Sequence, residues 1–301
     1  MKLKLIIPVM VLGVFLSIGC TKNDSSSFSY SNVTMMDWKG YSSLIANPNN
    51  PFDFVGSMHN QILDYVIGKT SLEYMNDSII NYLTDKFMDS VYNDYSGQMT
   101  QADFATFIAS VDTFVSALTR GTADYCTVIS DSYLCTALNE VSNMLIGMIN
   151  TSLVSPTEFA QYVITYENQI LEQNEYSSPD APTINEQAQA LAALSIARYS
   201  YCYWYEVVNN SNSPWYFYQN NTKDCPIPEI GRCIRDVAVT AAADVRGFFG
   251  EVDTPADPNN PTQGGLRINI SLSRAGKASS KKWKSQKGIV YDSEGNPYYT
   301  N

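Results

Sequence analysis

The sequence predicts an all-α fold, a helical bundle of about seven helices in residues 50–250. Two observations support this fold class. Apolar residues recur at spacings of three and four along most of this region, which is the period of an amphipathic helix. Residues that favour helix N-termini, such as Ser, Thr and Asn, stand before several of these stretches. Strict alternation of apolar and polar residues, typical of strands, is confined to the C-terminal tail.

The first two helices are predicted from their N-terminal signals. In residues 50–66, Asn50 can cap a helix and Pro51 suits its first position. The second helix is predicted to begin with a capping-box pattern, Thr70 followed by Glu73. Its apolar stripe then runs through Leu72, Met75, Ile79, Leu83, Phe87 and Val91.

Five further helices are predicted in the same way. The third spans residues 100–120, the fourth residues 134–148 and the fifth residues 155–171. The sixth, residues 183–208, is rich in Ala and apolar along most of its length, so we expect it to be central. The seventh covers residues 228–250.

Residues 251–301 are predicted to be a linker followed by a small β-containing tail. Pro, Asn, Gly and Thr crowd residues 252–266. Residues 267–272 alternate like a strand, and the segments on either side of residues 292–296 have the pattern of a short β-hairpin. A lone hairpin is only marginally stable, so it must dock on the helical body or stay mobile.

Charge is distributed unevenly along the chain. The net charge is −11, and an acidic body argues against nucleic-acid binding. We interpret the basic stretch in residues 267–287 as a solvated linker. The alternatives are that it folds back on the acidic body or contacts anionic lipid headgroups. Its basic residues are Arg267, Arg274, Lys277, Lys281, Lys282, Lys284 and Lys287.

The N-terminus resembles the signal peptide of a bacterial lipoprotein. Two lysines precede an apolar run from Leu5 to Leu16, which is too short to span a bilayer. Gly19 and Cys20 follow, then Ser-rich polar sequence, and in lipoproteins a cysteine in this place receives lipid. The leucine stands one residue further from the cysteine than in the usual lipobox pattern.

This resemblance implies a cellular location for the protein. Residues 1–19 are expected to be a signal peptide, and residues 20–49 a tether with lipid attached to Cys20. The protein is then a lipoprotein of the bacterial cell envelope, with the lipid as its membrane anchor. We expect the outer membrane, on its periplasmic or its surface face. No later segment is expected to span a membrane.

Five cysteines remain besides the lipid-attachment residue. Outside the cytoplasm they can pair, and an odd number leaves at least one free or intermolecular. The pairs closest in sequence are Cys126 with Cys135 and Cys225 with Cys233. Cys202 can then be a small buried side chain, although the connectivity of the five stays open.

His59 is the only histidine. It lies on the apolar arc of the first helix, with Asp53 and Asp64 on an arc roughly 100° away. We interpret His59 as a packing residue, and the alternative is a general base oriented by one of these two carboxylates. One histidine and no CxxC spacing give no reason to predict a metal site. No motif predicts a cofactor either.

Two residues bear on how this helix is packed. Gly56 lies at the edge of the apolar arc, where a missing side chain lets another backbone approach closely. Arg198, in the apolar sixth helix, needs a carboxylate partner if it is buried, and Asp53 and Asp64 are the candidates.

Aromatic residues gather beside asparagines in residues 199–218. Aromatic faces next to amides can bind a glycan or a peptide, so Trp204, Trp215, Tyr216 and Tyr218 are the candidate ligand-binding residues. In the competing interpretation, Trp204 and its neighbours pack the core while the aromatic residues of the loop cover it.

Three motifs resemble those of a family of helical secreted or lipoprotein-like proteins from Bacteroidota-type bacteria. Residues 50–60 follow the pattern N-P-[FY]-[DE]-x-[VI]-G-x-x-H-N, and residues 200–204 the pattern S-x-x-Y-W. Residues 243–247 follow the pattern Ala-Asp-x-x-Gly, although Phe248 and Phe249 stand where the family often has Gly and Ala. The resemblance brings no established activity.

The function that the sequence favours is non-catalytic binding of a ligand or partner by a lipid-anchored envelope protein. The first alternative is a hydrolase that uses carboxylates and His59. The second is a secreted, toxin-like effector whose tail, residues 252–301, engages a target while the helical body stays folded without it.

Overall fold

The computed structural model describes residues 44–93, 95–127, 129–148, 154–173, 184–209, 213–215, 230–249, 268–287, 289–291 and 297–299. This part of the chain is predominantly helical, so the all-α prediction is confirmed. The predicted signal peptide, Cys20, most of the tether and the linker at 252–266 lie outside the described residues.

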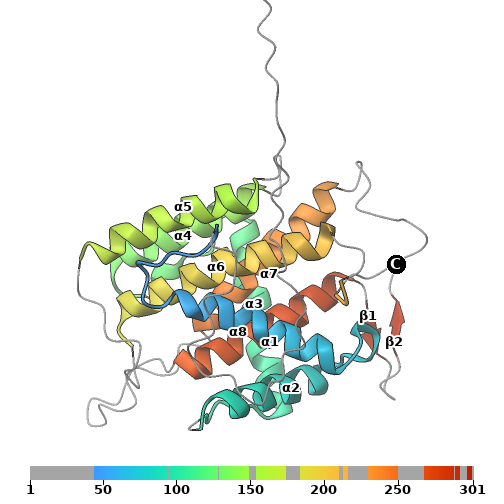
Figure 1. The fold of residues 1–301 in the computed structure, drawn as a ribbon. Coiled ribbons are helices and arrows are strands. Elements are labelled where there is room, and N and C mark those ends of the chain that lie inside the picture. Colours follow the sequence, from blue (N-terminus) through green and yellow to red (C-terminus); the bar gives the residue numbers. More distant parts are fainter. Residues whose placement is uncertain are drawn as a thin grey trace, which may run out of the picture.

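Eight α-helices and two short strands make up the described part (Figure 1). The helices are α1 (Asp53–Lys69), α2 (Asp77–Val91), α3 (Gln101–Thr119), α4 (Ser132–Met148), α5 (Pro156–Leu171), α6 (Glu186–Asn209), α7 (Ile230–Phe249) and α8 (Ile268–Gln286). Two 3-10 turns are η3 (Leu72–Tyr74) and η4 (Tyr125–Thr127), and the strands are β1 (Ile289–Tyr291) and β2 (Pro297–Tyr299).

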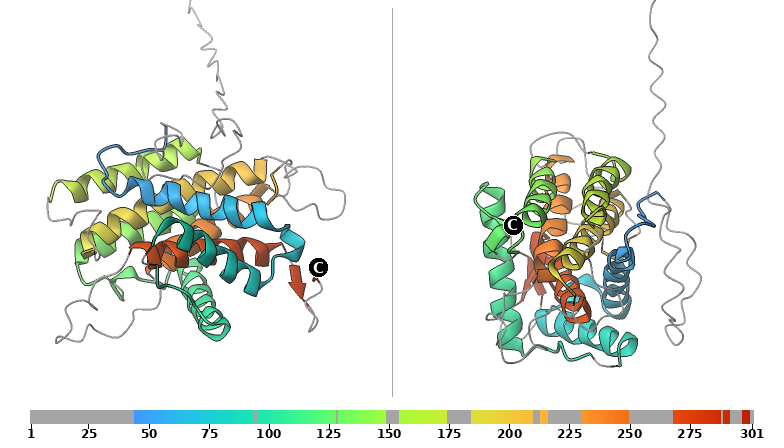
Figure 2. Two further views of the ribbon diagram at one scale, coloured as in Figure 1. Left: turned by 60° about the horizontal axis from the view of Figure 1, so that its bottom comes forward. Right: turned by 90° about the vertical axis from the view of Figure 1, so that its left-hand side faces the viewer.

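The centre of the bundle is formed by α1, α6, α7 and α8. Helix α6 packs against α1, α5 and α7, while α8 packs against α1, α2 and α7. Helices α4 and α5 cover one side of this group and α2 the other (Figure 1). Helix α3 lies on the face opposite α1 (Figure 2). The prediction that the sixth helix is central is confirmed, since α6 is buried along most of its length.

Three glycines let the central helices approach closely. A Cβ atom on Gly56 would lie 2.5 Å from a carbonyl oxygen of α6, and one on Gly276 would lie 2.6 Å from the Ile62 side chain of α1. A Cβ atom on Gly247 would lie 2.7 Å from the Ala278 side chain of α8. The predicted role of Gly56 in close backbone approach is therefore confirmed.

Helix α8 corrects the prediction for residues 267–287. Residues 268–272 of the expected strand at 267–272 are helical, and the helical body does not end at residue 250. The helical period of apolar residues could not be seen in the sequence, because the buried face of α8 consists largely of small and polar residues. These are Asn269, Ser271, Leu272, Ser273, Ala275, Gly276, Lys277, Ala278, Ser279, Ser280, Trp283 and Lys284.

The basic residues of this segment fold back on the acidic body rather than forming a solvated linker. Lysine ammonium groups of α8 lie 2.6 Å from the Asp77 carboxylate and 2.7 Å from the Asp112 carboxylate. Lys277 is fully buried and lies 2.6 Å from Asp85, whose oxygen also accepts from Tyr95. Ion pairs thus connect α8 to α2 and α3.

The helix starts agree with the sequence at some positions and differ at others. Thr100 caps α3, and the Ser155 side chain caps α5 in a capping box, as their sequences indicate. The predicted start at Thr70 is wrong, because that segment forms only the 3-10 turn η3. Helix α2 begins later, where the Asn76 side chain accepts a hydrogen bond from the Ile79 amide at 3.0 Å.

The C-terminal strands β1 and β2 pair antiparallel, with Ile289 opposite Tyr299. The residues that would form the turn of the predicted hairpin, 292–296, lie outside the described part of the chain. Among the described helices, only α3 is long and apolar enough by length and composition to cross a membrane. No such helix was expected from the sequence. Here its Phe104, Phe107 and Val111 side chains are buried in the bundle.

Candidate functional site

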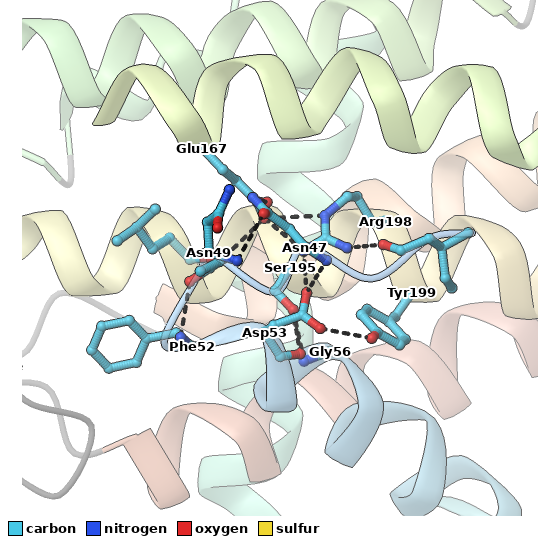
Figure 3. Close-up of polar contacts among 12 residues, drawn as sticks. Asn47, Asn49, Phe52, Asp53, Gly56, Glu167, Ser195, Arg198 and Tyr199 are labelled. Atoms are coloured by element: carbon cyan, nitrogen blue, oxygen red, sulfur yellow. Dashed lines mark hydrogen bonds and ion pairs between the residues drawn. The ribbon is translucent and has the colours of Figure 1, made fainter. Parts of the chain in front are cut away.

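A group of charged and polar side chains in the interior surrounds Arg198 on α6 (Figure 3). The Arg198 side chain is fully buried, and its Nη2 lies 2.9 Å from Glu167 Oε1. The guanidinium also donates to Asp53 and to the backbone carbonyl of Ile45. The predicted Asp53 partner is confirmed, whereas Glu167 on α5 was missed and Asp64 lies elsewhere.

Two asparagines complete this arrangement, which we call the Arg198 cluster (Asn47, Asn50, Asp53, Glu167, Arg198 and Tyr199). Asn47 Nδ2 donates to Glu167 Oε2 at 2.8 Å, and Asn50 Nδ2 donates to Glu167 Oε1 at 3.0 Å. The Tyr199 hydroxyl donates to Asp53 Oδ2 at 2.8 Å. The carboxylates are thus occupied by donors, and the cluster ties the segment before α1 to α5 and α6.

Pairing and burial act differently on the two buried charges of the Arg198 cluster. Burial raises the pKa of Glu167 despite its contacts with Arg198 and Asn47, so the charge of this carboxyl is disfavoured. Burial lowers the pKa of Arg198, but the nearby Glu167 and Asp53 carboxylates outweigh it, and the pKa is raised overall. Arginine is therefore a permanent cation here. A cluster with occupied oxygens and a buried cation has a structural role and presents no free group for acid–base chemistry.

A second polar group forms around His59 on α1 and Asp244 on α7. His59 Nε2 lies 3.4 Å from Asp244 Oδ2, and both side chains are 0% exposed. His59 Nδ1 lies 3.1 Å from Asn60 Oδ1, and Asp244 accepts a hydrogen bond from Ser200. Trp204 and Ser279 of α8 also contact this group, and Trp204 Nε1 donates to Ser279 Oγ at 3.1 Å.

The distance between His59 and Asp244 would fit an ion pair, but burial opposes both charges. Burial lowers the pKa of His59 to about 4, with the Asn60 hydrogen bond acting in the opposite direction. Burial raises the pKa of Asp244 to about 8, against hydrogen bonds from Ser200, Ser279 and Trp204. Both groups are therefore uncharged at neutral pH.

The predicted site residues do not come together. His59 is enclosed in the core, Asp53 belongs to the Arg198 cluster, and Asp64 accepts from the Tyr203 hydroxyl at 2.9 Å. The carboxylate beside His59 is Asp244, which was missed as its partner. The available signal was a single Asp in the Ala-rich run of the seventh helix, within the Ala-Asp-x-x-Gly motif.

The tryptophans proposed for ligand binding are part of the core. Trp204 stacks on Trp283 with ring centroids 4.3 Å apart, and Trp215 is only 1% exposed. Trp215 Nε1 donates to the Tyr203 hydroxyl at 2.8 Å. Trp204 and Trp215 therefore present no ring face to a ligand, and that prediction is wrong for these two.

The structure does not test the other two proposed ligand-binding residues. Tyr216 and Tyr218 lie outside the described residues, so their role stays a prediction. The residue before Tyr216 is held in place, because Trp283 Nε1 of α8 donates a hydrogen bond to the Trp215 carbonyl at 3.0 Å.

The cysteines are partly assigned by the structure. Cys126 and Cys135 form a disulfide with their Cα atoms 4.9 Å apart, which confirms that pairing. Cys202 is buried, as expected, but it is disulfide-bonded and is therefore not the cysteine left without a partner. The Cys225 and Cys233 side chains lie outside the described part. Asp124 lies close to the disulfide sulfurs, but disulfide sulfurs are not the thiolates that bind metal ions.

No protein-family model, no curated protein and no solved structure matches this chain. The function is therefore argued from the geometry of the described residues and from the sequence itself.

Proposed function

We propose that this protein is a lipid-anchored component of a bacterial cell envelope that binds a ligand or partner and does not catalyse a reaction. The observation that carries the non-catalytic part is the burial of His59 with Asp244. A general base must reach the proton that it abstracts. Neither side chain of this pair has any exposed surface.

The envelope location rests on two independent features. The apolar run before Cys20 and the polar sequence after it have the order expected of a lipoprotein signal. The Cys126–Cys135 disulfide suits the oxidising conditions outside the cytoplasm. We place the folded body on the periplasmic or surface face of the outer membrane, at the end of the tether.

The binding surface that we propose includes Tyr216 and Tyr218. These residues follow Trp215, which is anchored in the core, and Asn220 and Asn221 come shortly after them. Aromatic faces with amide groups suit a glycan or peptide ligand. The finer features, a C-terminal β-hairpin docked on α8 and membership of the Bacteroidota-type family, belong to the same proposal.

No observation favours the effector alternative in its original form. That version requires residues 252–301 to be separable from a folded body. Helix α8 lies within these residues and forms part of the core.

Lipid attachment can be tested by labelling cells with an alkyne analogue of palmitate. The wild-type protein is expected to carry the label and to sediment with membranes. The Cys20→Ser variant is expected to lose the label and to leave the membrane fraction. Equal labelling of both proteins would remove the anchor from the proposal.

The binding surface can be tested on an array of bacterial glycans and peptides. The double variant Tyr216→Ala/Tyr218→Ala is expected to lose at least tenfold in affinity for any ligand that the wild type retains, with an unchanged Tm. Tyr82→Ala is the matched control, because Tyr82 is 61% exposed on the outer face of α2. Binding that survives the double substitution, or is lost equally in the control, would contradict the proposal.

A further inference from the structure

We propose that His59 and Asp244 form a pH-sensitive lock at the centre of the bundle. The pair holds one proton, carried by Asp244, and loss of that proton at alkaline pH loosens the junction of α1, α6, α7 and α8. This inference concerns the folded body and is independent of the proposed ligand.

The proton position on His59 follows from its hydrogen bonds. Asn60 Nδ2 donates to the Tyr199 carbonyl at 3.0 Å, so the amide oxygen of Asn60 is the atom that faces His59. An amide oxygen only accepts hydrogen bonds. His59 Nδ1 must therefore carry a hydrogen, and in the neutral ring Nε2 is an acceptor.

This acceptor faces Asp244. His59 Nε2 and Asp244 Oδ1 are both buried, and neither has a hydrogen-bond partner among the described side chains. An imidazole lone pair next to a carboxylate is repulsive, whereas one proton between the two groups removes the repulsion. Full burial favours placing that proton on Asp244, because no charge is then created in the core.

The groups that contact the pair are uncharged on every neighbouring helix. They are Asn60 from α1, Ser200 and Trp204 from α6, and Ser279 from α8. In the described part of these helices, most charged side chains contact groups other than Asp244. The pairs are Asp53 with Arg198, Asp64 with Tyr203, Lys69 over Tyr65, Glu186 with Ser130, Asp236 with Lys287, Arg246 over Phe114, Lys277 with Asp85, Lys281 and Lys284 with Asp77, and Lys282 with Asp112. Of the others, Glu206 is an anion, Arg235 is exposed, and Arg274 lies near the like charge of Lys277. None of the cations in the described part of the chain acts on Asp244, so an ionised Asp244 would lack a cation partner among these residues.

The surroundings leave little room to hydrate a new charge. Gly56 lies one turn before His59, and Gly247 lies one turn after Asp244. The close contacts of α1 with α6 and of α7 with α8 are therefore next to the pair. Water can reach an ionised Asp244 only if these helices separate. We therefore expect ionisation to appear as local opening.

The direction of the pH effect follows from the two shifted pKa values, about 4 for His59 and about 8 for Asp244. Between about pH 6.5 and pH 8 the closed state holds a proton on Asp244 that the open state lacks, so stability falls as pH rises. Between about pH 4 and pH 6.5 the open state holds an extra proton on His59, and the two slopes cancel. The opening equilibrium should rise about twenty-fold from pH 6 to pH 9.

The test is hydrogen–deuterium exchange of the full chain between pH 6 and pH 9, corrected for intrinsic rates. Amides of α1 around His59 should show the rise and level off above about pH 9, while amides of α5 should not. Asp244→Asn should abolish the rise, because the asparagine amide donates to His59 Nε2 at any pH. Asp112→Asn, at a surface ion pair with Lys282, is the matched control and should retain it.

Two results would overturn the lock. The first is an Asp244→Asn protein that keeps the full pH dependence. The second is a wild-type protein whose α1 amides respond to pH no more than its α5 amides. The second comparison needs no substitution, so it decides the matter even if the variant does not fold.

Discussion

Arg198 of α6 reaches Glu167 of α5 across the core, with 2.9 Å between Nη2 and Oε1 and no exposed surface on either side chain. The same guanidinium holds Asp53 at the start of α1 and the Ile45 carbonyl before it. One side chain thus connects three parts of the chain that are far apart in sequence. Removal of Arg198 would leave the buried Glu167 without its cation, and removal of Glu167 would leave the buried Arg198 with Asp53 as its remaining carboxylate partner.

Glu167→Gln and Arg198→Met are each expected to lower the free energy of unfolding by about 3–5 kcal/mol, the usual loss when one partner of a buried pair is removed. Urea denaturation at neutral pH measures the change. Lys282→Ala is the control, because its pair with Asp112 is partly exposed and should contribute about 0.2–1 kcal/mol. Buried variants that lose no more than this control would show that the cluster is not a stabilising pair.

A chain that ends at residue 251 is expected not to fold, because it lacks α8 and leaves the inner faces of α1, α2 and α7 uncovered. Circular dichroism should show no cooperative thermal transition. A chain that ends at residue 287 keeps α8 and loses only β1 and β2, so it should keep the transition. A cooperative transition in the shorter chain would restore the picture of a separable tail.

The helices that could be predicted are those with an apolar stripe, and their starts were predicted best where a capping side chain is present. Helices α3 and α5 are of this kind, with caps at Thr100 and Ser155. Helix α8 could not be predicted, because it packs through Ser, Ala, Gly and Lys residues whose burial depends on neighbours from distant segments. Apolar periodicity detects only helices that bury large apolar side chains.

The contacts of the candidate site were also predictable only in part. An arginine in an apolar helix must be paired, which led correctly from Arg198 to Asp53. The sequence could not show that Glu167 and Asp244 face α6 and α1, because these contacts depend on how the helices are arranged. Composition likewise could not distinguish Trp215 as a buried ring from Trp215 as an exposed one.

Trp283→Ala is expected to lower the free energy of unfolding by about 3–5 kcal/mol, because it removes a buried ring that stacks on Trp204 and leaves a cavity. The loss of its hydrogen bond to the Trp215 carbonyl should also free the start of the aromatic loop. Thermal denaturation measures the first effect, and faster proteolysis within residues 216–229 would report the second. Tyr82→Ala should change stability by less than about 0.5 kcal/mol. A Trp283→Ala protein as stable as this control would contradict the packing of α8.

Gly56→Ala reverses the usual effect of filling a glycine in a helix. At an unhindered helical site the change should stabilise the protein by about 0.5–1 kcal/mol. Gly68, near the end of the same helix, has no atom within 4 Å of an added Cβ and provides that comparison. At Gly56 the added Cβ would lie 2.5 Å from a carbonyl oxygen of α6, so α1 and α6 must move apart. We expect the free energy of unfolding to fall by about 1–3 kcal/mol, which is typical of overpacking. Urea denaturation of both variants should give changes of opposite sign, and a stabilised Gly56→Ala protein would show that the two backbones are not in close contact.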